Sequence, residues 1–494
     1  MTNFSGKHLN AGTGGPKGGG MDGRHNVNEI AEMSAQYLVD AAEGACFEFK
    51  QTELGLIPAD WELVEIESLN VIGQPAIKAG PFGSSLTKDI YVNDGFKIYG
   101  QEQVISGDHQ FGDYFVDELK FRQLRSCEVL PGDILLSLVG TAGKLLIIPE
   151  NAAKGIINPR LLRFRLNQNK IIPLFFKNLF ESERVQSYLA MSAQGGTMAV
   201  LNASILKRLS IPLPNIIEQT AIANALSDVD ALIRELEKLI AKKQAIKTAT
   251  MQQLLTGRTR LPQFALREDG TPKRTKPSEL GEVPEDWEVV EFGCTLKEFR
   301  NGYAFSANGY SSTGTPIITM AQIGLSGSFQ FDISKVNKWD SEQQDSLKEF
   351  WVRDGDLLIA MTDVTPDKNL IGQMTIAKLG GIALLNQRVG LLRLKNEIAY
   401  TGYFSFLSCL PVWKTYCKGV ASLGVQANIG TSDIRKAKVP LPSIKEQTAI
   451  ATILSDMDAE IQALEQRLGK TRQIKQGMMQ ELLTGKTRLP FNKD

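Results

Sequence analysis

The sequence lacks an apolar run long enough to cross a bilayer, a paired-cysteine motif and a cluster of histidines. The N-terminal stretch MTNFSGKHLNAGTGGPKGGG has no apolar signal-peptide core, so we expect a cytoplasmic protein. The five cysteines are scattered without a CxxC motif, which favours reduced thiols over disulfides or a zinc site. The three histidines are too few and too dispersed for a metal cluster, and we expect no bound metal.

Net charge is also absent, because 55 Lys and Arg balance 55 Asp and Glu. A nucleic-acid-binding chain is often basic overall, so this balance counts mildly against one. The basic residues are unevenly distributed, however. Residues 151–180 contain six Lys or Arg and no acid, and residues 368–432 contain seven and one acid, Glu397. Two basic segments at matching positions of the chain favour an anionic partner.

Much of the sequence is an internal repeat. Residues 211–262 align without a gap on residues 439–490, with 31 of 52 positions identical, and EQTAIANALSD recurs as EQTAIATILSD. The upstream matches are LGLIPADWELVEI (54–66) with LGEVPEDWEVVEF (280–292), VLPGDILLS (129–137) with VRDGDLLIA (352–360), and NPRLLRFRL (158–166) with NQRVGLLRL (386–394). Each half therefore contains a similar unit followed by a long helix, and the stretches between the shared elements differ almost completely.

The duplicated segments predict two long helices that pair with each other. Apolar residues recur at alternating steps of four and three, the spacing of a coiled-coil seam, with Glu, Lys and Arg on the other faces. The seam residues are Ile222, Leu226, Val229, Ile233 and Leu236 in the first helix, and Ile450, Leu454, Met457, Ile461 and Leu464 in the second. Each helix has the other copy as its obvious partner. We therefore expect an intramolecular antiparallel coiled coil with pseudo-two-fold symmetry.

The remaining segments are expected to be rich in strands. LLRFRL and LLRLK alternate apolar and basic residues, which predicts strands with one polar face. The expected fold class is α+β, with two similar strand-rich α/β units separated by the two long helices. The expected segments are a flexible Gly-rich N-terminus (1–25), an N-terminal helix (26–50), a first unit (51–214), a first helix (215–257), a linker (258–280), a second unit (281–442), a second helix (443–485) and a C-terminal tail (486–494).

None of the catalytic motifs that we searched for is complete. GKT (485–487) lacks the earlier glycine of a phosphate-binding loop and ends a helix instead of following a strand. Asp108, Glu118 and Lys120 have a spacing that a metal-dependent nuclease could use, but the second half does not repeat it. NPRL (158–161) lacks the second proline and the aromatic residue of a DNA amino-methyltransferase motif. We expect a non-catalytic chain.

The doubled pattern resembles the DNA-specificity subunit of type I restriction–modification enzymes. The resemblance covers residues 50–490 and rests on the two PLPxxxEQxAI helices, their LLTGxxRLP endings, the two PxDWE starts, both GD-apolar turns and GPFGSSL (80–86). It implies two target-recognition domains, each reading one half of a bipartite, asymmetric double-stranded DNA site. It also implies docking of two adenine-methyltransferase subunits that carry S-adenosylmethionine, and of restriction/translocase subunits that use ATP and Mg. This chain itself would bind no cofactor.

DNA contacts are expected on loops that can enter a groove and on the basic strands beside them. The expected base-contacting residues are Ser84, Ser85, Lys88, Tyr99, Gln101, Thr197, Asn301, Tyr303, Tyr310, Thr319, Gln322, Gln426 and Asn428. The expected phosphate-contacting residues are Arg163, Arg165, Arg393 and Lys395. Phe82 and Phe305 are expected in the core instead of stacked on bases.

Three other functions are consistent with parts of the pattern. A coiled-coil scaffold that binds proteins would explain the helices but not the paired basic strands. A specificity subunit of another bipartite-site restriction–modification system would share the same features. A single-chain modification enzyme would need the cofactor motifs that the sequence lacks. DNA binding in the presence of a partner methyltransferase separates the scaffold from the DNA reader, and cofactor binding by the isolated chain tests the enzyme.

Overall fold

The computed structural model describes residues 48–82, 85–138, 143–192, 203–422 and 427–489. The chain divides into two compact units. Unit 1 comprises residues up to Glu237 together with the C-terminal segment from Arg467, and unit 2 comprises Lys238–Gln466. Each unit therefore combines one globular part with portions of both long helices. The expected Gly-rich segment 1–25, and all but the end of the expected helix 26–50, lie outside the described residues.

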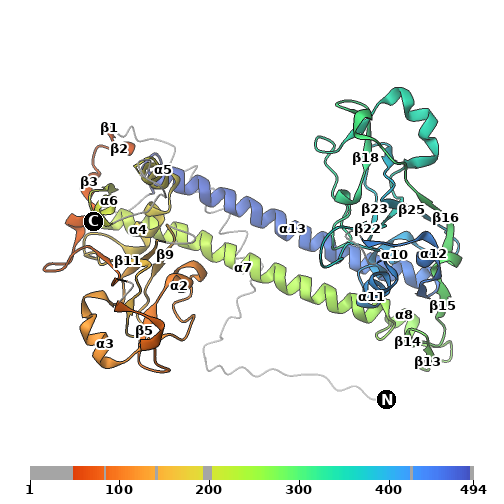
Figure 1. The fold of residues 1–494 in the computed structure, drawn as a ribbon, viewed down its shortest axis with the longest axis horizontal. Helices are drawn as coiled ribbons and strands as arrows, with labels where there is room; N and C mark the ends of the chain where they lie inside the picture. Colours follow the sequence, from red (N-terminus) through yellow and green to blue (C-terminus); the bar gives the residue numbers. More distant parts are fainter. Residues whose placement is uncertain (1–47, 83–84, 139–142, 193–202, 423–426, 490–494) are drawn as a thin grey trace, which may run out of the picture. The chain divides into compact units, whose positions relative to one another are not determined.

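Unit 1 contains two four-stranded sheets, labelled in Figure 1, in the orders β6-β5-β10-β7 and β4-β11-β8-β9. Strands β5 and β10 are parallel, and the other neighbours in these sheets are antiparallel. Two-stranded ladders β1-β2 and β12-β3 complete the unit. The strands are β1 (Phe49–Thr52), β2 (Gly55–Pro58), β3 (Glu62–Glu65), β4 (Ile77–Ala79), β5 (Phe96–Tyr99), β6 (Phe115–Val116), β7 (Glu128–Val129), β8 (Ile134–Ser137), β9 (Leu145–Ile147), β10 (Gly155–Ile157), β11 (Leu161–Phe164) and β12 (Ser210–Leu213). The helices are α2 (Gln101–Ser106), α3 (Glu118–Gln123), α4 (Pro173–Phe180), α5 (Glu183–Ser192) and α6 (Ala203–Lys207), with short 3-10 turns η1 (Ile66–Leu69), η3 (Lys88–Ile90) and η4 (Arg125–Cys127).

Unit 2 repeats this plan with sheets β16-β25-β21-β23 and β17-β19-β18-β24-β20. Strands β18 and β24 form the parallel pair, and ladders β13-β14, β15-β27 and β22-β26 are antiparallel. The strands are β13 (Thr275–Ser278), β14 (Gly281–Pro284), β15 (Glu288–Glu291), β16 (Leu296–Asn301), β17 (Tyr310–Ser311), β18 (Thr315–Ile318), β19 (Lys338–Trp339), β20 (Trp351–Val352), β21 (Leu357–Ala360), β22 (Thr362–Asp363), β23 (Met374–Ile376), β24 (Ala383–Leu385), β25 (Val389–Leu394), β26 (Ala427–Asn428) and β27 (Lys438–Leu441). The helices are α8 (Pro262–Ala265), α9 (Phe292–Thr295), α10 (Thr401–Leu407), α11 (Pro411–Val420) and α12 (Thr431–Lys436), with 3-10 turns η5 (Ala307–Gly309), η6 (Met320–Gln322) and η7 (Ser341–Phe350).

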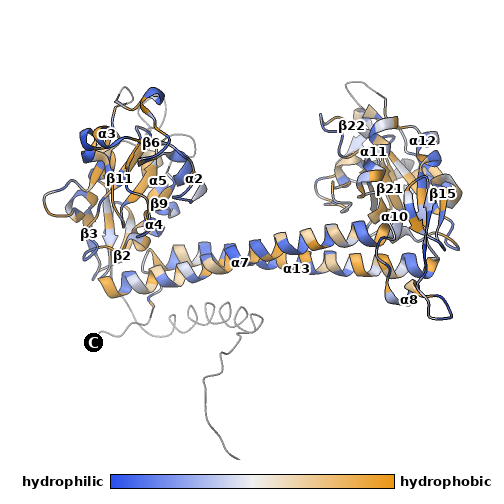
Figure 2. Cartoon of the chain, turned by 90° about the horizontal axis from the view of Figure 1, so that it is seen from below, coloured by the Kyte–Doolittle hydropathy of each residue, from blue (hydrophilic) through white to orange (hydrophobic). Residues whose placement is uncertain are grey.

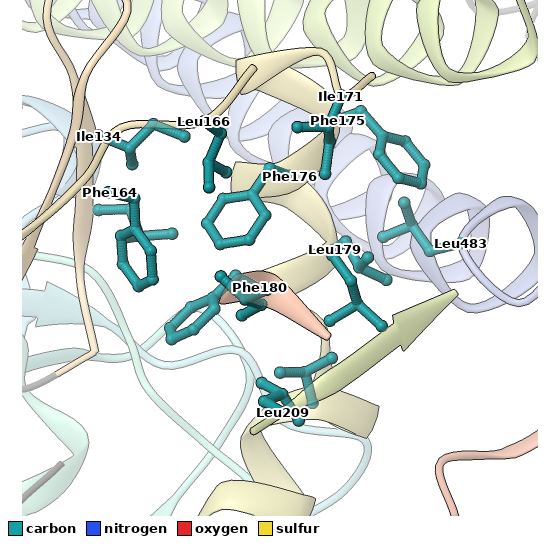
Figure 3. Packing of buried hydrophobic residues seen from close by; sticks show 14 of the residues in the cluster. Ile134, Phe164, Leu166, Ile171, Phe175, Phe176, Leu179, Phe180, Leu209 and Leu483 are labelled. Carbon is teal, nitrogen blue, oxygen red and sulfur yellow. The ribbon is translucent and has the colours of Figure 1, made fainter. Parts of the chain in front are cut away.

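The core of unit 1 is built from aromatic side chains that β11 and α4 bring together (Figure 3). The ring of Phe164 lies 5.1 Å from that of Phe176 and 5.8 Å from that of Phe180, measured between centroids. Leu483, which follows the second long helix, belongs to the same buried cluster. Burial of each large apolar side chain contributes about 1.5–3 kcal/mol. The C-terminal segment is therefore part of the core of the unit that contains the first half of the sequence.

Two long helices, α7 (Ile216–Leu255) and α13 (Ile444–Leu482), contribute to both units. Within each unit their portions run antiparallel. The ion pairs show this, because the residue numbers of the partners rise along α7 and fall along α13. The pairs are Asp230–Lys475 and Glu237–Arg472 in unit 1, and Lys243–Glu460 and Lys247–Asp458 in unit 2. The pairing confirms the expected antiparallel coiled coil. Among the described residues, no helix combines the length and the apolar character that a membrane span requires.

The predicted seam residues are buried or half-buried along both helices. Ile222, Leu226 and Val229 are at most 2% exposed and belong to the core of unit 1, whereas Ile450 and Leu454 belong to the core of unit 2. Figure 2 shows the alternation of hydrophobic and hydrophilic residues along α7 and α13. The stripe thus packs on the globular parts as well as on the other helix, which the spacing alone does not reveal.

The segment 258–280, expected to be a linker, is structured in unit 2. It contains α8 and strand β13, and β13 pairs with β14 in register from Thr275 opposite Pro284. Arg267 forms an ion pair with Glu285 at 2.8 Å. The ladder β13-β14 corresponds to β1-β2 of unit 1, so each globular part begins with the same hairpin.

In unit 1 the repeated EQ, DW and TRLP motifs meet in one buried cluster. Glu218 at the start of α7 is 1% exposed and accepts a hydrogen bond from the indole of Trp61 at 3.2 Å. Arg488, beyond the end of α13, bonds both carboxylate oxygens of Glu218, one at 2.6 Å, and also both oxygens of Asp60 at 3.1 Å. Burial raises the pKa of Glu218, and the hydrogen bond from Arg488 opposes that rise.

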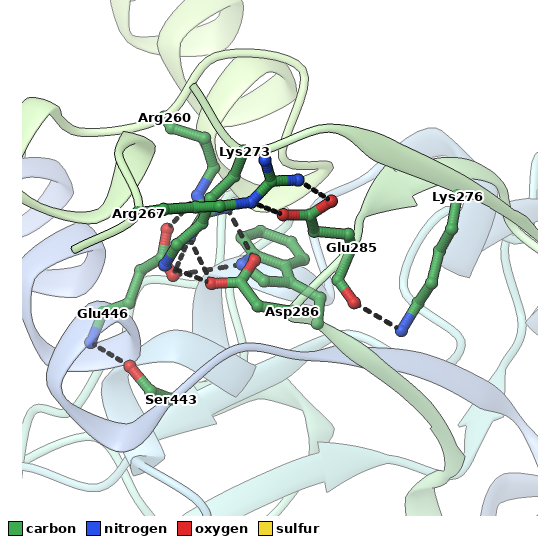
Figure 4. A network of polar contacts seen from close by, with 9 residues as sticks. Arg260, Arg267, Lys273, Lys276, Glu285, Asp286, Ser443 and Glu446 are labelled. Carbon is green, nitrogen blue, oxygen red and sulfur yellow. Dashed lines mark hydrogen bonds and ion pairs between the residues drawn. The ribbon is translucent and has the colours of Figure 1, made fainter. Parts of the chain in front are cut away.

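Unit 2 contains an equivalent cluster, in which each residue comes from the opposite repeat to its counterpart in unit 1 (Figure 4). Glu446 at the start of α13 accepts from Trp287 at 3.1 Å and from Arg260 at 2.6 and 2.8 Å. Arg260 also bonds Asp286, and although burial acts to raise the pKa of Asp286, Arg260 and Lys273 lower it to about 2. The arginine at the end of each repeat's helix therefore completes the cluster of the other repeat. This reciprocal exchange accounts for the presence of the same motifs in both halves.

Candidate nucleic-acid interface

Two basic residues, Arg163 in strand β11 and Arg165 directly after it, have their partners inside unit 1. Arg163 is 3% exposed and donates to the backbone oxygens of Ser126 and Glu128. Burial lowers the pKa of Arg163. Arg165 makes two hydrogen bonds to the carboxylate of Asp133, at 2.8 and 2.6 Å, and Asp133 is 2% exposed. The expectation that these two arginines lie on an open polar face is wrong, because other groups of the unit cover them.

Unit 2 uses the corresponding aspartate in the same way. Arg393 on β25 forms ion pairs with Asp356 at 3.2 Å and with Glu298 at 2.8 Å. The GD turn before a buried strand therefore supplies the carboxylate that fixes an arginine of the neighbouring strand. Lys395 is exposed and donates to the backbone oxygen of Cys294 at 2.9 Å. Phosphate contact by Lys395 stays a prediction, whereas Arg393 already has two internal partners.

We expect Arg165→Ala to destabilise unit 1 by about 3 kcal/mol, because it leaves the buried carboxylate of Asp133 without its two-pronged partner. Thermal unfolding of the purified chain measures the loss. Arg160→Ala is the matched control, since Arg160 lies in the same basic segment but is exposed. Its effect should stay within about 0.5 kcal/mol. Unchanged stability of Arg165→Ala together with weaker DNA binding would contradict the structural role.

The candidate base-contacting residues divide by their exposure. Tyr99 is fully buried and donates its hydroxyl to the oxygen of Ala153 at 2.5 Å, and Gln322 is 9% exposed and accepts from the backbone of Thr319. The expectation that Tyr99 and Gln322 are accessible is therefore wrong. The candidates that are exposed or half-buried are Ser85, Lys88, Gln101, Asn301, Tyr303, Tyr310, Thr319 and Asn428, and for these DNA contact stays a prediction. Ser84, Thr197 and Gln426 lie outside the described residues.

The two phenylalanines that we expected in the core differ. Phe82 is 87% exposed, so its expected burial is wrong. Phe305 is half-buried, and its ring lies 5.0 Å from Trp339 and 5.0 Å from Tyr303 in edge-to-face contacts. Tyr303 and Tyr310 are 39% and 38% exposed beside this group. Unit 2 therefore has an aromatic surface cluster that combines apolar faces with phenol groups.

In unit 2 this cluster borders a hollow at the carboxyl ends of the parallel strands β18 and β24. Parallel neighbours end at the same edge of a sheet, so the segments that follow them lie together. The hollow has a volume of about 360 Å³, and its lining residues are Phe305, Tyr310, Thr319, Met320, Ala321, Asn386, Gln387 and Arg388. Asn386 accepts from the backbone N–H of Arg388 at 3.1 Å, which fixes the turn after β24.

Unit 1 has the same frame at the ends of β5 and β10. Asn158 accepts from the backbone N–H of Arg160 at 2.9 Å, and its own N–H donates to the oxygen of Tyr99 at 2.8 Å. In unit 2 the N–H of Asn386 donates to the oxygen of Ile318 at 3.0 Å. The turn after β5 is closed by Gln103, which accepts from Gly100 as Gln322 accepts from Thr319.

Sequence reasoning did not select Arg160 and Arg388 as site residues. Both are exposed, and among the described residues neither guanidinium has a hydrogen-bond or ion-pair partner. The signal was present as the aligned Asn-Pro-Arg and Asn-Gln-Arg at the start of a matched strand. An Asx turn at both positions would have indicated a constrained, outward-facing third residue. Within the described residues, no group of three or more His, Cys, Asp and Glu is placed to hold a metal.

The described residues thus contain two copies of one frame, each with its own polar edge. A sequence model of the family described as the type I restriction modification DNA specificity domain matches residues 60–248 and again residues 284–476, which together make up more than half of the chain. The chain therefore belongs to the type I restriction–modification DNA-specificity family. It is the subunit that recognises DNA and not a catalytic one, in agreement with the resemblance seen in the sequence.

Two relatives from Methanocaldococcus jannaschii are similar over most of the chain. One is named as a proposed MjaX type I restriction enzyme specificity subunit. It is 29% identical over 89% of this chain and 97% of its own length. The MjaVIII specificity subunit is 27% identical over 75% of this chain and 83% of its own. The crystal structure of a type I restriction–modification S subunit from M. genitalium has the same fold, with a TM-score of 0.50 and 16% identity over 88% of this chain and 97% of that one.

Proposed function

We propose that this chain reads a bipartite, asymmetric DNA target, with one half-site for each unit. The observation that supports the proposal is that the two units share the same strands and turns but differ in the residues at the ends of their parallel strands. Both units have the parallel strand pair, the Asn-x-Arg turn and the aspartate–arginine pair after the GD turn. The residues that follow β5 are Gly100, Gln101 and Glu102, whereas those that follow β18 are Thr319, Met320 and Ala321. Equivalent surfaces with different donors and acceptors should prefer different base pairs.

We further propose that the long helices dock two adenine-methyltransferase subunits and that restriction/translocase subunits join them. The duplicated helix segments offer two similar faces, which suits two copies of one partner. S-adenosylmethionine would be bound by the methyltransferase partner, and ATP and Mg by the restriction partner. Such a complex acts on chromosomal and incoming DNA, and so works in the cytoplasm.

The test is to express the chain with its methyltransferase partner in a host without type I systems and to map modified adenines across the genome. We expect one motif of two specified halves with an unread spacer. A chimera in which residues 100–102 carry the sequence Thr-Met-Ala should change only the half-site of unit 1. Modification at one continuous motif would contradict the two-reader proposal. Complex formation with no sequence preference would favour a protein-binding scaffold.

A further inference from the structure

The sheet edge at the ends of the parallel strands carries an exposed arginine in each unit. Arg160 follows β10 and Arg388 follows β24, at aligned positions of the repeat. The strand arginines nearby have carboxylate partners, as Arg165 has in Asp133. Among the described residues, no carboxylate or carbonyl accepts from Arg160 or Arg388. These two guanidinium groups are therefore available to a ligand.

The backbone at both positions is held rigidly. In each unit, the asparagine two residues earlier accepts from the arginine N–H, and its own N–H donates to the end of the neighbouring parallel strand. The backbone oxygen of the arginine then accepts a hydrogen bond from the residue that directly follows a strand of the other sheet, Leu138 after β8 in unit 1 and Met361 after β21 in unit 2. A side chain that projects from a backbone held in this way loses less conformational freedom on binding than one on an open loop.

The surroundings of both arginines combine aromatic rings with polar groups. Arg388 lines the hollow with Phe305, Tyr310 and Gln387. In unit 1, Tyr91 and Tyr114 are in ring contact, with centroids 5.4 Å apart. Burial raises the pKa of Tyr91, and the charge of Arg160 lowers it. A surface that contacts only phosphates does not require such a mixture, whereas the edge of a base offers both apolar and hydrogen-bonding groups.

We propose that Arg160 and Arg388 are equivalent specificity-determining residues, each of which reads a guanine edge in the half-site of its own unit. The guanidinium fork matches the O6 and N7 acceptors of guanine in the major groove, which makes arginine the commonest base-reading residue. The inference rests on the proposed two-reader function and adds which residues read. The neighbouring side chains, which differ between the units, then set the adjacent base pairs.

Two single variants test the proposal in the complex of full-length chain and methyltransferase. Arg388→Ala should reduce discrimination at one base pair of one half-site by roughly 5- to 150-fold and leave the other half-site unchanged. Arg160→Ala should do the same in the other half-site. Mapping of modified adenines measures both. Arg353→Ala is the matched control, because Arg353 is an exposed arginine of unit 2 that does not line the hollow.

Arg388→Lys separates base reading from phosphate contact. Lysine keeps the charge but lacks the two-pronged guanidinium, so discrimination at that base pair should remain as low as in Arg388→Ala. Uniformly weaker modification with both half-sites intact, restored by lysine, would overturn base reading in favour of a phosphate contact. If the wild-type complex modifies a two-part motif and neither arginine variant changes that motif, the inference is wrong but the proposed two-reader function stands. A wild-type motif without two parts would overturn the proposed function and the inference with it. Thermal unfolding of each variant checks that folding is preserved.

Discussion

Arg488→Ala should destabilise unit 1 by about 3 to 5 kcal/mol and leave unit 2 nearly unchanged. The substitution removes the partner of Glu218, a carboxylate with 1% of its surface exposed, and the tryptophan hydrogen bond alone does not compensate a buried charge. Hydrogen exchange followed by mass spectrometry reports the two units separately and is the appropriate measurement. Peptides of β11 and α4 should exchange faster, while those of β25 and α10 should not.

The reciprocal variant, Arg260→Ala, should reverse this pattern, because Arg260 completes the cluster of unit 2. Lys486→Ala is the matched control: Lys486 lies two residues from Arg488 in the same motif, is exposed, and should change stability by less than about 0.5 kcal/mol. The Arg488→Ala loss should also shrink as the pH falls. Glu218 has a raised pKa in the folded chain, so acid neutralises the unpaired carboxylate. Equal loosening of both units by either variant would contradict the reciprocal exchange.

Gly485→Ala should have the second largest effect, a loss of about 2 to 5 kcal/mol in unit 1. Gly485 lies in the turn three residues after the end of α13 and has φ +69°, a conformation that L side chains rarely adopt. An added Cβ would also lie 2.3 Å from Cγ of Pro58 and 3.1 Å from Cζ2 of Trp61, so the PxDWE start of the unit would have to move. Thermal unfolding combined with exchange of the β1-β2 and β3 peptides measures the effect.

Gly477→Ala, inside the helix that precedes Gly485, supplies a control of opposite sign. Gly477 lies in the interior of α13, and a Cβ there would meet no atom within 4 Å. The substitution should stabilise the chain by about 1 kcal/mol through helix propensity. A similar loss from both glycine variants would mean that the helix tolerates no change at all, and would remove the explanation based on the contact with Pro58 and Trp61.

The features that follow from local periodicity were predictable. The seam from Ile222 to Leu236 is a matter of spacing, and spacing also indicated that the two helices are partners. The exposure of Arg163 was not predictable in this way, because alternation along LLRFRL defines two faces and does not say that both are covered. Its neighbour Arg165 finds its carboxylate, Asp133, 32 residues earlier in the chain.

The site depends even more on distant contacts. Tyr99 was chosen as a candidate because it stands beside polar residues in KIYGQEQ, but it is the last residue of β5, and its hydroxyl bonds Ala153, 54 residues away. The edge formed by Arg388 and Tyr310 depends on β18 lying parallel to β24. A pairing of strands so far apart in the sequence leaves no local signature.

The division of the chain has a consequence for its synthesis on the ribosome. Unit 2 is one continuous stretch, Lys238–Gln466, whereas unit 1 needs the segment that begins at Arg467. Domains generally fold in the order in which they emerge, N-terminal first. Here the half that is translated first must wait for Leu483 and Arg488 to close its core and its buried cluster, and the later half completes before it. A chain that ends before Arg467 would therefore contain all of unit 2 but an unfinished unit 1, whose apolar core would lack the residues that close it.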